Sequence, residues 1–178
     1  MHKFEHVYVS VILVVSAMSG CAGAKEDSQR PSNHALTVEQ AKVFIAEQKQ
    51  LDTIPKAVWQ QLLPKAQYKV LWEQDTERPF TGKYVDNKAQ GVYVTAGCRL
   101  PVFSGAHKFE SGTGWPSFWE VFNKDNVVLK EDISWGMKRT EVLSKCGEHL
   151  GHVFDDGPAP TGLRYCINSL ALDFIPAK

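Results

Sequence analysis

The residues best suited to redox chemistry in this chain are a cysteine and the two polar residues that flank it. Cys166 lies between Arg164 and Asn168, and the run from Tyr165 to Phe174 is rich in β-branched, aromatic and other apolar residues, which predicts a buried strand. Side chains alternate between the two faces of a strand, so the cation, the thiol and the amide would share one face. A nearby cation stabilises a thiolate, but free cysteine is also among the most buried residue types. These residues alone leave a reactive and a structural Cys166 equally open.

Two histidines precede this stretch. His149 and His152 are three residues apart, so in a strand they would point to opposite faces and would not share a metal. In a turn the two imidazoles could converge. Taken alone they are structural histidines, whereas beside a thiolate they become candidate proton donors to a leaving oxygen.

A loop rich in glycine, proline and aromatic residues runs from Ser111 to Trp119. Its aromatic side chains, Trp115 and Phe118 among them, either cap the core or form a wall for a small apolar group. A thioether or sulfoxide methyl group would suit such a wall, because sulfur packs well against aromatic rings.

The remaining cysteines do not form a zinc ribbon, which needs two Cys-x-x-Cys pairs. Thr95 stands three residues before Cys98, and Leu143 stands three residues before Cys146. A four-thiolate zinc site cannot be built from this set, so we expect no metal cofactor.

The N-terminus predicts export. Lys3 is followed by an apolar run and then by small residues, which is the pattern of a signal peptide. Met18 to Cys21 resembles a lipobox, whose cysteine is lipidated, whereas Ala22 to Ala24 offers ordinary cleavage instead. We favour the lipoprotein, with a signal peptide over residues 1–20 and a periplasmic protein held to the membrane only through a lipid on Cys21.

The rest of the 178-residue chain predicts one domain behind a tether. The 20 basic and 20 acidic residues give no net charge, which argues against a nucleic-acid partner. We expect a flexible tether over residues 21–36, a helical extension over 37–57 and the catalytic domain over 58–178. Periodicity and turn residues predict helices over 38–50, 55–64 and 65–72, and short strands over 92–94, 127–129, 134–137, 141–143 and 150–154.

Four motifs in this order resemble the methionine sulfoxide reductase B family. They are Glu77–Gly82, Gly112–Phe118, His149–Pro158 and Arg164–Asn168, and the resemblance covers about Val58 to Phe174. It implies a mainly β fold, a β-tent of two antiparallel sheets with short N-terminal helices. It also implies reduction of the R epimer of methionine sulfoxide, free or in exported proteins, which repairs oxidative damage.

The resemblance also implies roles for single residues. Attack by a thiolate would release methionine and leave a cysteine sulfenic acid, which a second thiol condenses to a disulfide. The residues matched by motif are Cys166 as nucleophile, Arg164 as the neighbour that stabilises its thiolate, His149, His152 and Asn168 around the sulfoxide oxygen, and Trp115 and Phe154 as the methyl-binding wall. From the aromatic loop we add Phe118 to the expected substrate-binding residues.

This chain departs from the family at the zinc pairs, where Thr95 and Leu143 stand, and at Thr113, where many members carry a recycling cysteine. The family's metal position implies that Cys98 and Cys146 lie close together. They are then unpaired thiols, a structural disulfide, or a source of the thiol that resolves Cys166. We favour the structural disulfide, with a monomeric enzyme recycled by an external thioredoxin-like reductant.

Two other functions stay open at this point. The chain could be a thiol peroxidase or disulfide reductase that uses Cys166 without an aromatic pocket. It could also be a surface-anchored binding module whose cysteines and histidines are structural. The loop that carries Trp115 and the paired histidines favour the sulfoxide reductase.

Overall fold

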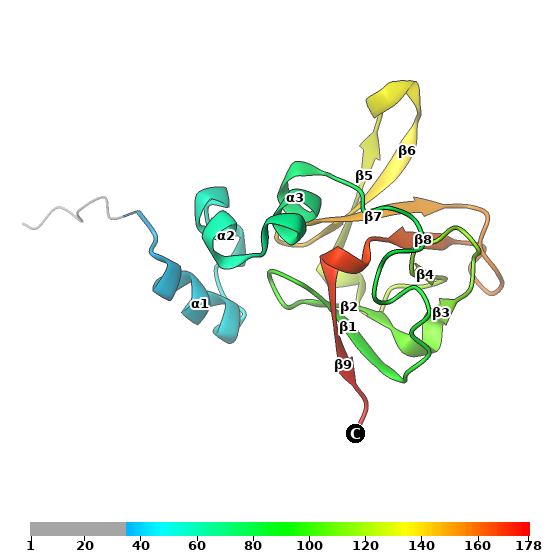
Figure 1. The fold of residues 1–178 in the computed structure, drawn as a ribbon, viewed down its shortest axis with the longest axis horizontal. Helices are drawn as coiled ribbons and strands as arrows, with labels where there is room; N and C mark the ends of the chain where they lie inside the picture. The colour runs from blue at the N-terminus through cyan, green and yellow to red at the C-terminus, as the bar shows by residue number, and fades with distance from the viewer. Residues whose placement is uncertain (1–34) are drawn as a thin grey trace, which may run out of the picture. The chain divides into compact units, whose positions relative to one another are not determined.

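A computed structural model of the chain describes residues 35–178 (Figure 1). The expected signal peptide, the lipidation site Cys21 and all but the last two residues of the expected tether lie outside the described residues. Within residues 35–178, no helix has the length and apolar character needed to span a bilayer.

Three short helices come first, as predicted. In α1, Val38–Glu47, the Thr37 hydroxyl accepts a hydrogen bond from the Gln40 N–H, and the Gln40 side chain accepts one from the Thr37 N–H. This capping box satisfies backbone groups of the first turn. The helix ends before the predicted Gln50 because Gln48 adopts a left-handed backbone conformation.

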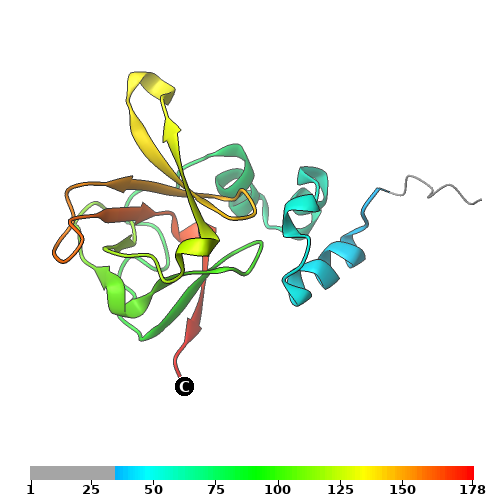
Figure 2. The same cartoon turned by 180° about the vertical axis from the view of Figure 1, so that it is seen from behind.

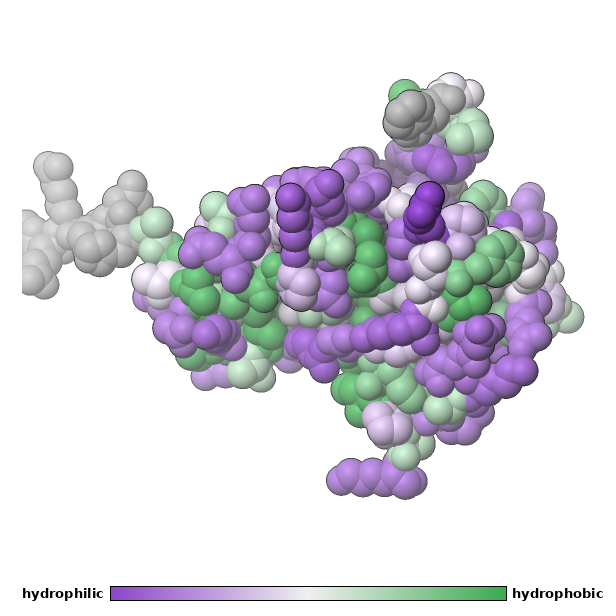
Figure 3. All heavy atoms as spheres, in the orientation of Figure 1, coloured by the Kyte–Doolittle hydropathy of each residue, from purple (hydrophilic) through white to green (hydrophobic). Residues whose placement is uncertain are grey.

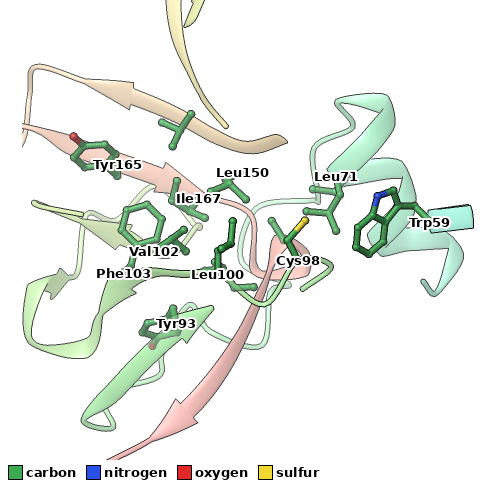
Figure 4. Packing of buried hydrophobic residues seen from close by; sticks show 14 of the residues in the cluster. Trp59, Leu71, Tyr93, Cys98, Leu100, Val102, Phe103, Leu150, Tyr165 and Ile167 are labelled. Carbon is green, nitrogen blue, oxygen red and sulfur yellow. The ribbon is translucent and has the colours of Figure 1, made fainter. Parts of the chain in front are cut away.

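Prolines begin the other two helices. Pro55 precedes α2, Lys56–Leu62, and Pro64 precedes α3, Lys65–Glu73. Proline suits this position because the first helical N–H groups have no intrahelical partner. Their buried sides contact the β-domain, where Trp59 and Leu71 lie beside Cys98 (Figure 4).

The strands form two antiparallel sheets, which confirms the expected mainly β class. The first sheet has the order β2-β1-β9, and the second has the order β3-β4-β8-β7-β6-β5. The first consists of β1, Gly91–Thr95, β2, Pro101–Ser104, and β9, Leu172–Pro176. The second consists of β3, Lys108–Phe109, β4, Ser117–Phe118, β5, Val127–Asp132, β6, Arg139–Ser144, β7, His149–Phe154, and β8, Arg164–Ile167.

The single strand predicted over Tyr165–Phe174 is wrong. The chain leaves β8 after Ile167, passes through a 3₁₀ turn over Ser169–Ala171 and enters β9 of the other sheet. The break is stabilised from elsewhere, since the Glu77 carboxylate accepts hydrogen bonds from the N–H groups of Ser169 and Leu170 at 2.5 and 3.0 Å. The residues from Tyr165 to Phe174 thus have the apolar composition of one long strand, although they pass from one sheet to the other.

The strand predicted over Ser134–Met137 is also wrong. Ser134–Gly136 is a 3₁₀ turn at the tip of the hairpin formed by β5 and β6. The Asp132 side chain accepts a hydrogen bond from the Ser134 N–H, and Gly136 has a φ of 71°. Asp132 and Gly136 therefore both favour a turn.

A group of aromatic rings packs in the core between the sheets, among aliphatic side chains (Figure 4). Phe103 of β2 stacks on Phe118 of β4 with ring centroids 4.5 Å apart, and Tyr93 of β1 meets Phe118 edge to face at 5.0 Å. All three side chains are fully buried. This packing fixes the first sheet against β4 and β8, and so fixes the backbone that carries Cys166.

Candidate active site

The register of β8 determines the neighbours of Cys166. Cys166 is paired with His152 of β7 on one side and with Ser117 of β4 on the other. Gly151 makes the approach of β7 and β8 possible, because a Cβ there would lie 2.1 Å from the Cys166 carbonyl oxygen. The histidine and the thiol are thus neighbours because of strand pairing, although they are 14 residues apart in the chain.

A cavity of about 200 Å³ opens next to Cys166. Its aromatic wall consists of Trp115 and Phe154, and the indole N–H of Trp115 donates to the Glu77 carbonyl oxygen at 3.1 Å, which fixes the ring. The complete lining is Thr76, Trp115, Arg139, Gly151, His152, Phe154, Cys166 and Asn168. Its size and its mixture of aromatic and polar groups suit one small side chain.

Cys166 is the free cysteine of the described residues and is partly buried. Burial raises the pKa of its thiol, while the Thr113 hydroxyl and the charge of Arg164 act in the opposite direction. The Thr113 Oγ1 lies 3.9 Å from the Cys166 Sγ. The thiolate therefore depends on these two neighbours to offset its desolvation.

Arg164 is held firmly beside the thiol. Its Nε and one terminal nitrogen donate to the two carboxylate oxygens of Asp156, each at 2.8 Å. Its guanidinium also lies over the Phe154 ring, 4.4 Å from the centroid. The ion pair raises the pKa of Arg164 further, so the cation persists at any physiological pH.

His152 faces the same cavity, and a carboxylate holds its ring. His152 Nε2 lies 2.9 Å from Asp132 Oδ2, and the same oxygen accepts a hydrogen bond from Arg139 at 2.7 Å. Hydrogen bonds from Ser134, His152 and Arg139 lower the pKa of Asp132, so the carboxyl group is an acceptor and His152 Nε2 carries a proton. The other ring nitrogen of His152 has no hydrogen-bond partner among the described residues.

His149 does not line the cavity of Cys166. It lines an adjoining cavity of about 300 Å³, together with His152, and the two imidazole centroids are 5.5 Å apart. Its Nδ1 lies 2.6 Å from Glu141, which also accepts a hydrogen bond from Gln74 at 3.0 Å. Burial lowers the pKa of His149 against the influence of Glu141, and its buried Nε2 has no hydrogen-bond partner within residues 35–178.

Asn168 lines the cavity, but its amide is already engaged with the backbone. Its Oδ1 accepts a hydrogen bond from the Glu77 N–H at 3.1 Å, and its Nδ2 donates to the Leu150 carbonyl oxygen at 3.1 Å. The side chain is almost fully buried. This geometry makes Asn168 the residue that holds the Glu77 loop and β7 together around the thiol.

Phe118 does not belong to the substrate wall. Its ring is fully buried between Phe103 and Tyr93, away from the cavity. In a strand only alternate residues share a face, and the register that turns Ser117 toward Cys166 turns Phe118 into the core.

The hairpin formed by β5 and β6 contributes site residues that the sequence analysis does not identify. Arg139 lines both cavities, and Asp132 and Glu141 each hold one histidine. The available signal was the spacing of Arg139 and Glu141, which places two charges on one face of a strand next to the histidines. Their buried partners are visible only once β6 is paired with β7.

Cys98 and Cys146 form a disulfide that joins the turn after β1 to the turn between β6 and β7. Beside it lies the fully buried carboxyl group of Glu148, which accepts hydrogen bonds from the N–H groups of Gly97 and Cys98, each at 2.9 Å. Burial raises the pKa of Glu148. With both sulfurs bonded to each other, and with Thr95 at a family ligand position, the residues present do not fit a four-thiolate zinc site.

In chemical terms the site offers a thiol, an imidazole held by a carboxylate, and an aromatic wall around a cavity for one side chain. This set can attack a polarised group, give a proton to the atom that leaves, and hold an apolar substituent.

A protein-family model described as the SelR domain matches residues 63–176. The chain is 58% identical over 117 residues to a protein of Methanosarcina barkeri, covering 65% of this chain and 82% of that protein. It is 56% identical over 121 residues to one of Thiobacillus denitrificans, covering 67% and 92%, and 51% identical over 131 residues to one of Pseudomonas savastanoi pv. phaseolicola, covering 72% and 100%. Each relative is named peptide methionine sulfoxide reductase MsrB.

Proposed function

This chain belongs to the methionine sulfoxide reductase B family, and from that membership we propose that it reduces the R epimer of methionine sulfoxide through Cys166, in exported proteins or as the free amino acid. Reduction of methionine sulfoxide is the family's reaction, which makes the protein an oxidoreductase. The observation that supports our assignment of the site is the convergence of Cys166, His152 and Trp115 on one cavity.

The proposed reaction balances without a further reactant. His152 takes the thiol proton of Cys166 on Nδ1, and it gives this proton to the sulfoxide oxygen as the thiolate of Cys166 attacks the sulfoxide sulfur. The methionine sulfur is reduced by two electrons, the Cys166 sulfur is oxidised by two electrons, and the oxygen ends on Cys166 as a sulfenic acid. Methionine leaves as the thioether.

The neighbouring residues supply orientation and charge. Trp115 and Phe154 hold the methyl group, and Arg164 favours the thiolate. Asp132 keeps His152 oriented with its partnered nitrogen protonated. His149 supports the oxygen side from the adjoining cavity, where its unpartnered Nε2 is available to a bound water or to the sulfoxide oxygen.

Recycling requires a thiol from outside the described chain. The position next to Cys166 is occupied by the hydroxyl of Thr113, and Cys98 and Cys146 are bonded to each other. We therefore assign the reduction of the sulfenic acid to an external thioredoxin-like protein or small thiol.

The test is an assay on the two separated sulfoxide epimers with a chemical reductant. We expect turnover of the R epimer and none of the S epimer. Cys166→Ser should be inactive, since a hydroxyl of far higher pKa cannot supply the thiolate. Equal rates on both epimers would contradict the assignment, and faster reduction of hydrogen peroxide than of either epimer would favour a thiol peroxidase.

Export and anchoring are a separate proposal, supported by the sequence of residues 1–24 alone. We propose a periplasmic lipoprotein with Cys21 as the lipidated N-terminus. The protein expressed in a bacterial host should partition into detergent, and Cys21→Ala should abolish this. A mature N-terminus at Lys25, found by mass spectrometry, would decide for ordinary signal cleavage.

A further inference from the structure

The hairpin formed by β5 and β6, residues 127–144, projects from the six-stranded sheet next to the site. Figures 1 and 2, which view the molecule from opposite sides, both show the hairpin extending past β7. Its strands pair from Val127 opposite Ser144 to Asp132 opposite Arg139, and β5 is an edge of the sheet. The residues beyond Asp132 and Arg139, 133–138, are called the hairpin tip below.

Apolar side chains are concentrated on this hairpin. Among the residues whose side chains the structure describes, it carries four of the eight large apolar ones that are exposed. Two of them, Ile133 and Met137, belong to the tip and are 73% and 52% exposed. Green surface is visible at this projecting end at the top of Figure 3. Single exposed apolar residues are common on proteins, but a cluster on a projecting element indicates an interaction surface.

The tip is tied to the catalytic groups. The Asp132 carboxylate accepts hydrogen bonds from His152 of β7, from Arg139 and from the N–H of Ser134. Asp132 and Ser134 both line the cavity that contains the two histidines, and Ile133 lies between them in the chain. The backbone on both sides of the exposed Ile133 is therefore fixed next to the cavity that contains the two histidines.

Charge does not determine what this surface binds. Lys138 of the tip forms an ion pair of 2.7 Å with Glu131 at the end of β5. The carboxylate of Asp132 is likewise shared between Arg139 and His152. The charges near the tip thus compensate one another, and the apolar side chains are what the surface offers to a partner.

We propose that the hairpin tip binds the polypeptide that flanks a methionine sulfoxide residue, and that it favours unfolded segments with apolar neighbours. This inference rests on the proposed function. The cavity beside Cys166, at about 200 Å³, accommodates one side chain, so the rest of a protein substrate lies on the surface around its mouth. Methionine occurs mainly in protein interiors, where its neighbours are apolar, and those neighbours are exposed once the oxidised segment unfolds.

The experiment compares three substrates on the full chain. They are free methionine R-sulfoxide, a peptide with one methionine R-sulfoxide between leucine and valine residues, and a peptide of equal length with serine and glycine neighbours. The variants are Ile133→Ser and Met137→Ser. The matched control is Leu129→Ser, since Leu129 is 51% exposed on the same hairpin but is three residues, or about 10 Å, from Asp132 along β5.

We expect each tip variant to lower kcat/KM on the apolar peptide about fivefold, which corresponds to about 1 kcal/mol at 1.4 kcal/mol per factor of ten. Turnover of free methionine R-sulfoxide should stay within about twofold of wild type. Leu129→Ser should match wild type on all three substrates. The wild-type protein should also prefer the apolar peptide to the serine and glycine peptide.

An unchanged kcat/KM on the apolar peptide would overturn the proposal. An equal loss on free methionine sulfoxide would overturn it as well, because the tip would then act on the catalytic groups and not on the flanking polypeptide. A wild-type protein that is inactive on all three substrates would instead refute the proposed function. The two ideas therefore fail through different measurements.

Discussion

Replacing Thr113 with cysteine places a second thiol beside Cys166. The Thr113 Oγ1 lies 3.9 Å from the Cys166 Sγ, whereas the sulfurs of a disulfide are about 2.0 Å apart. The two atoms must therefore approach by about 1.9 Å, which rotation of two side chains on facing segments can supply. In Thr113→Cys we expect the sulfenic acid formed by one turnover to condense with the introduced thiol.

The expected rate advantage follows from proximity. A flexible tether gives an effective concentration of about 1 mM, so against an external thiol at about 0.1 mM the introduced thiol should react at least about tenfold faster. The wild-type protein should keep a sulfenic acid that dimedone can trap after one equivalent of methionine R-sulfoxide. Thr113→Cys should lose this labelling and form a new crosslink to Cys166.

Peptide mapping by mass spectrometry is the measurement, because it also separates any crosslink that involves Cys21. Thr113→Ser is the matched control, since it keeps the hydroxyl and adds no thiol. Dimedone labelling of Thr113→Cys equal to that of wild type would refute the inferred proximity. A crosslink from Cys166 to Cys98 or Cys146 in the wild-type protein would refute recycling by an external thiol.

Three further predictions test the surroundings of the thiol. Gly151→Ala should destabilise the protein by about 1–3 kcal/mol in urea unfolding, because its Cβ would lie 2.1 Å from the Cys166 carbonyl oxygen and β7 must move. Arg164→Leu removes a charge that lowers the pKa of Cys166, so that pKa should rise, activity at pH 7 should fall, and activity should recover as the pH increases; a parallel loss at every pH would contradict this. The double variant Cys98→Ser, Cys146→Ser should lose about 2–4 kcal/mol of unfolding free energy while retaining R-epimer turnover at low temperature, and unchanged stability would show that the disulfide does not constrain the unfolded chain.

Local patterns predict much of this fold because several elements are stabilised by their own residues. The start of α1 follows from Thr37 and Gln40, which cap each other three residues apart. Pro55 and Pro64 are also local signals, because each directly precedes one of the next two helices. The mainly β class likewise follows from short apolar runs between turn residues.

The errors arise where a distant residue decides the local conformation. The break between β8 and β9 depends on Glu77, whose carboxylate contacts a turn more than 90 residues later in the chain. Composition between Tyr165 and Phe174 contains no sign of that contact. The hairpin tip depends on Asp132 and Gly136, whose turn signals were outweighed by the apolar residues between them.

The residues of the site likewise fall into those that the sequence identifies and those that depend on strand pairing. Motif resemblance reaches Cys166, His152 and Trp115, because their types and order are visible in the chain. The composition of the aromatic loop assigns Phe118 to the same wall, although the strand register turns that ring into the core. Neither the motifs nor the loop identifies Arg139, whose role depends on the pairing of β6 with β7.

The disulfide and the histidine strand belong to one structural unit. Cys146 and Glu148 lie in the turn between β6 and β7, and His149, the first residue of β7, follows Glu148 directly. The Glu148 carboxyl group binds the backbone of Gly97 and Cys98 across the same junction that the disulfide closes. The start of β7 is thus fixed by one covalent bond and by a buried hydrogen-bonded carboxyl group. Because Glu141 then positions the His149 ring from β6, a chain with only one cysteine from each family zinc pair can still hold this histidine in place.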